Sequence, residues 1–499
     1  MNKKYFLMLF AFCTIGMHIH GQELEINSDL VKWGEDYKAP DKTARYDYIG
    51  TIEGTDYYSY GYYTDEGMMR RLNRIGFMRV QNGKVLSESD DYIKLPYLSL
   101  VKAMTLKNEL CILYEVKNKS DDSFEFRMKK IDKTTFKEQQ DTILFRVDLK
   151  KKHKQKVLFM PSQTGNNYVA LLTSTDKKYD LMTLTLFYYN AEMQEQWQTK
   201  YSSKQDFKIT PLDVLASDCG KVYMISKKTD DETTEDSKMY YDYELGEAPC
   251  LLSIISPNDI TEINLPETYP SLQANIFEID TNRLYIAFSH RKRYASIEYN
   301  LESKTSKSFS SFNYAQSKGK TFWTVKKIIK SDNGNIVSLV CDDYEMEILN
   351  TASQERHFFN GRNFYILCHN PQTDTLYTKM ISRAVHSSAF CDIDYGRYEG
   401  ILFFGYKNNV YAIYNADRNY DDLSNVILLE SSPTRTGSQI VANMIKINEM
   451  GQTTLTGLVP YKELGLMFSP AMSFRSDAKT IQINSLKGKH ITFGELSLE

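Results

Sequence analysis

Residues 332–341 read Asp-Asn-Gly-Asn-Ile-Val-Ser-Leu-Val-Cys, a turn followed directly by an apolar run. Gly and Asn tolerate the positive φ of a tight hairpin, and the Asp side chain can accept hydrogen bonds from the turn backbone. Similar turns recur every 52 to 62 residues, at Gly54, Asn108, Asn166, Gly220, Asn282, Gly334, Gly396 and Gly451. A repeat of this length, with one small sheet per period, predicts an all-β chain folded as a β-propeller.

Each turn is followed by a short apolar burst typical of a strand, and most periods contain a second hairpin. In the third period this hairpin joins residues 182–189 to 196–201, and in the fourth it joins 251–255 to 260–265. Four strands per period fit a propeller blade. Eight turns predict eight blades, and seven if the first or last unit is imperfect. The final unit is expected over 441–498, and the ring closes with its own strands or with one from 23–32.

The first residues predict export. Asn2-Lys3-Lys4 is a charged start, Tyr5 to Ile15 is apolar, and Gly21 is a plausible last residue before cleavage. We therefore expect a signal peptide over 1–21, a polar lead-in over 22–43 and a single propeller domain over 44–499. The mature protein would be periplasmic or extracellular. No later apolar stretch reaches the length of a membrane span, so we expect none after signal removal.

Charge and cysteine content exclude some classes of function. The net charge is -3, and it becomes -5 when Lys3 and Lys4 leave, which gives no bulk electrostatic case for nucleic acid. The six cysteines that remain would allow disulfides in an exported protein. However, Cys111, Cys341 and Cys368 lie inside apolar strand runs, where a small buried thiol is common. We expect no disulfides.

The Asp-x-Gly/Asn turn followed by an apolar strand resembles the first hairpin of blades in uncharacterised secreted bacterial β-propeller proteins. The resemblance covers residues 44–498 and rests on periodicity. The WD dipeptide, the kelch double Gly and the quinone-binding repeat motifs are missing from the sequence. The resemblance therefore implies a scaffold, and it brings no residue-level activity.

No linear catalytic or metal motif is present. The sequence lacks a Gly-x-Ser-x-Gly elbow, a His-Glu-x-x-His helix and a complete P-loop, because Tyr314 stands where the first Gly before Gly319-Lys320-Thr321 should be. The oxygen-rich stretch 417–422 departs from a calcium loop at Asp422 and Leu428, so we expect a solvated turn. No cofactor and no metal is expected.

Two charged loops become candidates once they are placed on a propeller. The resemblance implies that loops between second and third strands lie opposite the Asp-x-Gly turns. The acidic insert 227–247 and the basic run His290-Arg291-Lys292-Arg293 would then be neighbours on one rim, and the basic run 150–154 would open on the same side. We predict Arg291, Lys292 and Arg293 as ligand-binding residues. The tyrosines of 57–63 could stack on a sugar or peptide, but we expect them to pack between blades.

These observations favour a monomeric, exported binding or interaction module for an unknown protein or glycan, with its ligand on the loop face. Two other classes stay open. One is a hydrolase or lyase whose site is assembled from several blades at the central channel. The other is a structural component of an envelope assembly.

Overall fold

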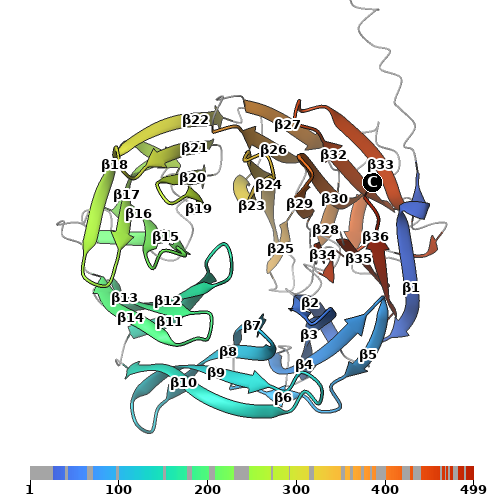
Figure 1. The fold of residues 1–499 in the computed structure, drawn as a ribbon, viewed down its shortest axis with the longest axis horizontal. Helices are drawn as coiled ribbons and strands as arrows, with labels where there is room; N and C mark the ends of the chain where they lie inside the picture. Colours follow the sequence, from blue (N-terminus) through green and yellow to red (C-terminus); the bar gives the residue numbers. More distant parts are fainter. Residues whose placement is uncertain are drawn as a thin grey trace, which may run out of the picture.

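The described strands form eight sheets arranged in a ring around one axis (Figure 1). The fold is an eight-bladed β-propeller, which confirms the predicted class and gives the higher of the two predicted blade numbers. The computed structural model describes residues 26–39, 43–64, 71–96, 100–149, 153–176, 182–201, 208–229, 247–270, 273–290, 293–313, 320–349, 355–359, 363–371, 376–382, 385–388, 401–417, 427–430, 440–460, 464–466, 468–469, 472–475, 481–487 and 490–498.

Blades 1 to 4 follow the chain, each ordered from the axis outward. Blade 1 contains β2 (Thr43–Ile52), β3 (Thr55–Thr64), β4 (Arg71–Gln81), β5 (Lys84–Glu88) and β6 (Ile93–Lys94), the last also paired with β4. Blade 2 contains β7 (Leu100–Leu106), β8 (Glu109–Asn118), β9 (Ser123–Ile131) and β10 (Glu138–Asp148). Blade 3 contains β11 (His153–Pro161), β12 (Asn167–Asp176), β13 (Met182–Asn190) and β14 (Glu195–Tyr201). Blade 4 contains β15 (Lys208–Ala216), β16 (Val222–Thr229), β17 (Glu247–Ile255) and β18 (Ile260–Pro270).

Blades 5 to 7 repeat this plan. Blade 5 contains β19 (Gln273–Asp280), β20 (Arg283–His290), β21 (Arg293–Asn300) and β22 (Thr305–Asn313). Blade 6 contains β23 (Lys320–Lys330), β24 (Ile336–Leu349), β26 (Asn363–His369) and β27 (Leu376–Ser382), and its sheet is extended by β25 (Glu355–Phe359), β28 (Val385–Ser388) and β31 (Ile427–Glu430). Blade 7 contains β29 (Leu402–Tyr406), β30 (Asn409–Asp417), β32 (Ile440–Ile447) and β33 (Thr453–Pro460).

Blade 8 joins the two ends of the described chain. Its strands are β34 (Phe474–Arg475), β35 (Ile481–Lys487), β36 (His490–Leu496) and, outermost, β1 (Val31–Lys38), which follows the short 3-10 helix η1 (Ser28–Leu30). Figure 1 shows β1 in blue beside β36 in red, and Val31 pairs with Leu496. The closing strand thus comes from 31–38. The propeller includes part of the stretch 22–43 that we expected to be a lead-in.

The structure corrects the assignment of the last two units. The inner hairpin of blade 7 turns at Lys407 and Asn408, which both have positive φ, whereas Gly396 lies outside the described residues. Gly451 lies in the turn between β32 and β33, the third and fourth strands of blade 7. Residues 441–460 therefore complete blade 7, and blade 8 starts after them. The prediction placed this hairpin turn at Gly396 and passed over Asn408, which shifted the register of the repeats.

The core lies between blades, and this explains the sequence pattern of the strands. Second strands such as β16 contact a neighbouring blade on each face, so the run Val222 to Ile225 is fully buried. Outer strands such as β14 alternate exposed and partly buried residues. A strand that is buried on both faces reads as a continuous apolar run, and one with a solvated face alternates.

Tyr57, Tyr58 and Tyr60 of β3 pack between blades, as expected, whereas the side chains of Tyr62 and Tyr63 are not described. Tyr58 and Tyr60 lie in one cluster with Phe474 and Phe493 of blade 8. Tyr57, which points to the other face of the sheet, packs against blade 2. The three side chains are almost completely buried, so the two seams of blade 1 account for them. Within the described part of the chain, no helix is long and apolar enough to cross a bilayer.

Candidate functional site

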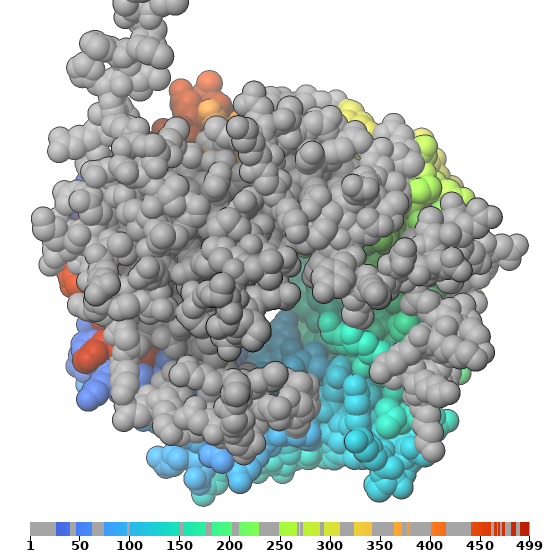
Figure 2. Space-filling model, turned by 180° about the vertical axis from the view of Figure 1, so that it is seen from behind, coloured from blue at the N-terminus to red at the C-terminus, as the bar shows by residue number. Residues whose placement is uncertain are grey.

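The two faces of the ring carry different connections. The turns between first and second strands, and between third and fourth strands, lie on one face, which we call the turn face. The connections between second and third strands, and between blades, lie on the opposite face, which we call the loop face. This follows from the antiparallel order of each sheet. Figure 2 shows the molecule from the side opposite to Figure 1, with described residues of blades 2 to 4, light blue to green, at its surface.

The turn face is held together by hydrogen bonds between neighbouring blades. The Asp218 carboxylate accepts hydrogen bonds from Ser162 and Thr164 of blade 3, at 2.6 and 2.8 Å. Ser217 donates to Glu278 of blade 5 at 2.8 Å, and the backbone N–H of Lys407 donates to Asp332 at 3.0 Å. These bonds tie together the turns of blades 3, 4 and 5, and those of blades 6 and 7.

The repeated Asp residues of these turns were expected to bond their own turn backbone. Only Asp280 does so in the described structure, by accepting the N–H of Asn282 at 3.0 Å. Asp218 and Asp332 instead bind the turns of adjacent blades. Asp394 lies outside the described residues. The recurrence of Asp thus reflects packing of blade against blade as much as the local turn.

The loop face carries strands that the propeller itself does not need. β25 comes from the connection between β24 and β26, β28 from the connection between blades 6 and 7, and β31 from the connection between β30 and β32. β25 pairs with the end of β24, β28 pairs with β25, and β31 pairs with β28 in parallel. Three connections of two blades therefore converge in one accessory sheet on the loop face.

The side chains of the predicted ligand residues lie outside the described structure. Arg291 and Lys292 lie outside the described residues, between β20 and β21, and Arg293 is the first residue of β21, with its side chain not described. Most of the acidic insert, residues 230–246, also lies outside them, as do 150–152 and 418–422. The expected proximity of the acidic and basic loops therefore stays a prediction.

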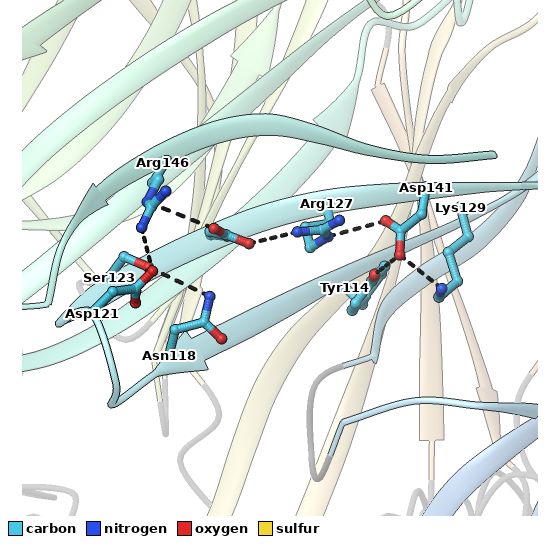
Figure 3. Close-up of polar contacts among 9 residues, drawn as sticks. Tyr114, Asn118, Asp121, Ser123, Arg127, Lys129, Asp141 and Arg146 are labelled. Carbon is cyan, nitrogen blue, oxygen red and sulfur yellow. Dashed lines mark hydrogen bonds and ion pairs between the residues drawn. The ribbon is translucent and has the colours of Figure 1, made fainter.

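A row of charged side chains follows the outer strands of blade 2 toward the loop face (Figure 3). Glu125 lies at its centre, with 4% of its side chain exposed, and contacts Arg127 at 2.7 Å and Arg146 at 3.6 Å. Arg127 reaches Asp141 at 3.0 Å, and Lys129 reaches Asp141 at 2.8 Å. At the loop-face end Arg146 pairs with Asp121 beside the β8–β9 turn. Opposite charges thus alternate along the row.

This charged row stabilises the sheet surface and has no free acid or base. Burial alone would raise the pKa of Asp141, but hydrogen bonds from Lys129, Tyr114 and Arg127 outweigh it and hold that pKa below its usual range. A carboxylate with three charged or hydroxyl donors is a poor proton acceptor near neutral pH. The row is therefore a structural network with an exposed end at the loop face.

Two other carboxylates bind the inner strand of the next blade. Glu115 of β8 accepts the backbone N–H of Val157 in β11 at 2.7 Å, and Asp213 of β15 accepts that of Ile276 in β19 at 2.7 Å. These N–H groups belong to innermost strands and bond a side chain instead of the second strand, so they lie on the free edge that faces the axis. Such bonds satisfy the edge strands around the axis.

Three lysines donate hydrogen bonds to backbone carbonyl groups of an adjacent blade. Lys117 bonds the carbonyl of Gln155 at 3.4 Å, Lys327 that of Phe403 at 3.0 Å, and Lys330 that of Ile279 at 2.9 Å. Burial lowers the pKa of Lys327. The axial side of the ring is therefore lined by polar side chains, although each inner strand packs apolar residues against its neighbours.

The histidines do not form a common site among the described residues. His369 is buried beside Phe309, and its Nε2 atom lies 3.8 Å from Glu298, across the seam between blades 5 and 6. His490 contacts Asp36 at 2.7 Å near the closing strand. No group of three His, Cys, Asp or Glu residues could hold a metal ion within the ranges described above.

Four of the five described cysteines are small buried residues in strands. Cys111, Cys250, Cys341 and Cys368 are buried and Cys219 is exposed, and these five form no disulfide with one another. Burial raises the pKa of Cys111 to about 12, so its thiol stays protonated and unreactive near neutral pH. Cys391 lies outside the described residues.

Neither a family model nor a curated protein matches the chain. Among solved structures, it is similar to an oligogalacturonate lyase in complex with manganese, at 11% identity over 78% of this chain and 86% of that chain, with a TM-score of 0.35. It is also similar to a Penicillium chrysogenum alpha-L-arabinanase complexed with arabinobiose, at 8% identity over 70% and 98%, TM-score 0.31. A Synechocystis apocarotenoid oxygenase mutant gives 11% identity over 96% and 95%, TM-score 0.36. At such low identity, these similarities indicate no activity for this chain.

Sequence reasoning missed several polar residues of the inner strands. Lys102, Lys156 and Asp213 were not singled out, because an isolated charge in a strand gives no motif. For Lys156, a sequence signal exists: Lys154, Lys156 and Leu158 of β11 alternate with Gln155, Val157 and Phe159, which are buried. The inner position of that strand, however, depends on the blade order.

Proposed function

We propose that the protein is an exported binding module that holds a protein or glycan ligand on its loop face. The observation that carries this proposal is the difference between the two faces. The turn face consists of short turns bonded from blade to blade, whereas the loop face has accessory strands from three connections. Binding residues concentrate on loops that a rigid scaffold positions.

Residues Arg291, Lys292 and Arg293 are the proposed contacts. Their connection joins β20 to β21 and so belongs to the loop face. Exposed charges contribute up to about 1 kcal/mol each, so one substitution alone would have a small effect. The alternative of catalysis by converging carboxylates gains little from the described inner strands, where Asp213 and Glu278 are bonded to adjacent blades.

The test is a binding screen of the mature protein against a glycan array and against proteins of its own envelope. The triple variant Arg291→Ala, Lys292→Ala, Arg293→Ala should retain the fold and weaken the selected ligand by roughly tenfold or more. A matched variant changes Lys137, Lys200 and Lys221 to Ala. These lysines are exposed on the turn face or the outer strand β14, so they should leave binding unchanged.

Two results would contradict the proposal. One is equal retention of every ligand by the parent and the loop-face variant, together with loss in the turn-face variant. The other is that no ligand is retained by the parent at low salt.

Export is tested separately by terminal sequencing of the native protein, which should begin near Gln22, and an intact Met1 would exclude cleavage there.

A further inference from the structure

A row of aromatic side chains crosses blade 1 on the face that packs against blade 8. Tyr46 of β2 pairs with Tyr60 of β3, and Tyr60 pairs with Gly76 of β4. Tyr92 directly precedes β6, whose pairing with β4 places it next to Gly76. A Cβ atom at Gly76 would lie 2.5 Å from the Tyr60 ring. The missing side chain therefore lets the rings of Tyr60 and Tyr92 meet edge to face, with their centroids 6.0 Å apart.

A carboxylate from the outer strand completes this cluster. Glu88 is the last residue of β5, and the hydroxyl group of Tyr37 in β1 donates a hydrogen bond to it across the seam between blades 8 and 1. Both strands are outermost in their blades and lie side by side at the rim of the ring (Figure 1). Glu88 and the rings of Tyr37 and Tyr92 are partly exposed, so solvent reaches them from the rim. We call the seam cluster the group of Tyr37, Tyr46, Tyr60, Glu88 and Tyr92.

Packing accounts for the rings of the seam cluster but leaves hydrogen-bonding capacity unused. Tyr60 is 1% exposed, and its hydroxyl group has no hydrogen-bond partner in the described structure. Buried hydroxyl groups are normally bonded, because a missing partner costs the desolvation of the group. Glu88 accepts one hydrogen bond, although a carboxylate offers about four acceptor positions. The cluster can therefore accept hydrogen bonds from a ligand.

The other charged side chains near the seam do not neutralise Glu88. Lys84 pairs instead with Glu35, at 3.2 Å. Arg74 and Lys94 lie opposite each other on β4 and β6, on the same face as the cluster but nearer the loop face. Neither forms an ion pair with Glu88 in the described structure, where the carboxylate is bonded by one neutral phenol. Glu88 is therefore a partly exposed negative charge beside aromatic rings.

Glu88 also dominates the electrostatic environment of the cluster. Burial raises the pKa of Tyr37, and the hydrogen bond to Glu88 and the charge of Glu88 raise it further. Burial raises the pKa of Tyr60 as well, and the charge of Glu88 is the next cause. Both phenols therefore stay protonated near neutral pH, and the potential at their hydroxyl groups is negative.

We infer that the seam cluster binds a primary ammonium group of a ligand that approaches from the rim of the ring. The ammonium supplies N–H donors for the unused lone pairs of Glu88, and its charge is attracted to the partly exposed rings of Tyr37 and Tyr92. The hydroxyl oxygen of Tyr60 is a further acceptor on the inner side of the cluster. The inference does not rest on the loop-face function, because residues 291–293 belong to blade 5. The ammonium can belong to a free amine or to a lysine side chain of a protein.

The experiment is a ligand-observed NMR titration of the mature protein at low salt with three probes. They are cadaverine, Nα-acetyl-lysine amide, and the same lysine amide acetylated at Nε, which is neutral. The two amines are expected to bind and the neutral probe is not. Glu88→Gln keeps an acceptor for Tyr37 and removes the charge, so binding of the amines should weaken about tenfold. Glu35→Gln makes the same charge change at an exposed position of the same seam and should bind like the parent.

Two variants of Tyr92 test the contribution of the ring. Tyr92→Phe keeps the aromatic face and should retain the binding of the amines. Tyr92→Leu removes that face and should weaken binding roughly threefold or more, because the cation–π attraction is lost. Equal affinities of the parent and Tyr92→Leu would exclude this ring from the site.

The two amines separate the two sources of the ammonium group. Binding of cadaverine without the lysine amide favours a free amine, and tighter binding of the lysine amide favours a lysine of a protein. Equal binding of the neutral probe, equal binding by Glu88→Gln, or no binding of either amine to the parent would overturn the inference. Unchanged melting shows that each variant is folded. If Glu88→Gln melts early, the charged and neutral probes on the parent still decide the outcome.

Discussion

Asp213 connects the inner strands of blades 4 and 5 through its bond to Ile276. Burial raises the pKa of this carboxyl group to about 7, although the N–H groups of Ile276 and Val214 lower it. No ion pair compensates for the charge among the causes of this shift. Asp213, which belongs to no sequence motif, thus has one of the most strongly raised carboxyl pKa values among the described residues.

The pH dependence of stability should report this residue. Its folded pKa lies above the unfolded value near 4, so the folded state holds the proton more tightly. The Asp213 contribution is therefore complete below about pH 4 and is lost as the pH rises through 7. Asp213→Asn keeps an acceptor for Ile276 and removes the charge. Its free energy of unfolding should match the parent at pH 4 and exceed it by roughly 2–4 kcal/mol at pH 8.

Asp213→Ala is the control for the hydrogen bond. It leaves the N–H of Ile276 without its acceptor, so it should destabilise at every pH by about 1–3 kcal/mol. Chemical denaturation at several pH values measures both variants. A constant difference between the parent and Asp213→Asn from pH 4 to pH 8 would show that the carboxyl group does not titrate as described.

The charged row of blade 2 gives a second prediction for single residues. Glu125 is almost fully buried between Arg127 and Arg146, so Glu125→Gln leaves two guanidinium groups short of charge and should cost about 1–3 kcal/mol. Asp121→Asn removes an exposed partner of Arg146 and should cost less than about 1 kcal/mol. Equal losses in the two variants, measured by urea denaturation, would mean that burial does not decide the contribution of the pair.

Single elements decide how the ring closes. β1 pairs with β36 at both of its ends, with a register shift between Trp33 and Asp36, and the seam with blade 1 leaves no room for a side chain at Gly34. A Cβ atom there would lie 2.3 Å from the carbonyl oxygen of Gly83. Lys84 contacts Glu35 at 3.2 Å, and Tyr37 donates to Glu88 across the same seam. A strand from the start of the described chain thus covers the edge of the last blade.

Removing β1 should open this seam. A chain that starts at Ala39 lacks the outer strand of blade 8 and exposes the edge of β36, which favours aggregation. We expect a melting temperature several degrees below that of a chain that starts at Gln22, with loss of single-step unfolding. Equal melting curves for the two chains would show that blade 8 is stable with three strands.

The elements also show where sequence reasoning works. The second hairpins of blades 3 and 4 lie where the apolar bursts and turns predicted them, in β13–β14 and β17–β18. The inner hairpin of blade 7 was missed because the turn was assigned to Gly396, whereas the chain turns at Lys407 and Asn408, both with positive φ. The closing strand was not predicted in full, because β1 carries polar residues on its solvated face and its partner is far away in sequence.

At the scale of the whole molecule, the repeat of the blades was predictable, and the contacts between neighbouring blades were not. The class of fold follows from recurring turns, and these are local. The hydrogen bonds between blades depend on which residues of neighbouring blades meet, as with Asp218 and Thr164. The candidate residues Arg291, Lys292 and Arg293 stay predictions.

Redox conditions should leave the whole molecule unchanged. Four of the five described cysteines are buried in strands, and none of the five pairs with another. Reductant should therefore shift the melting temperature by less than a degree or so, whereas loss of a structural disulfide costs about 2–5 kcal/mol and lowers it by several degrees. Differential scanning calorimetry with and without reductant measures this. A drop of several degrees would show a disulfide that involves Cys391.

Hydrogen exchange of the protein with and without its selected ligand tests most directly whether the loop face binds. Binding on this face predicts slower exchange at the start of β11, at the connection between β20 and β21, and in the accessory strands β25 and β28. The turns of the opposite face, including 217–221 and 331–335, should exchange at unchanged rates. Protection of those turns, with unchanged exchange on the loop face, would contradict the account.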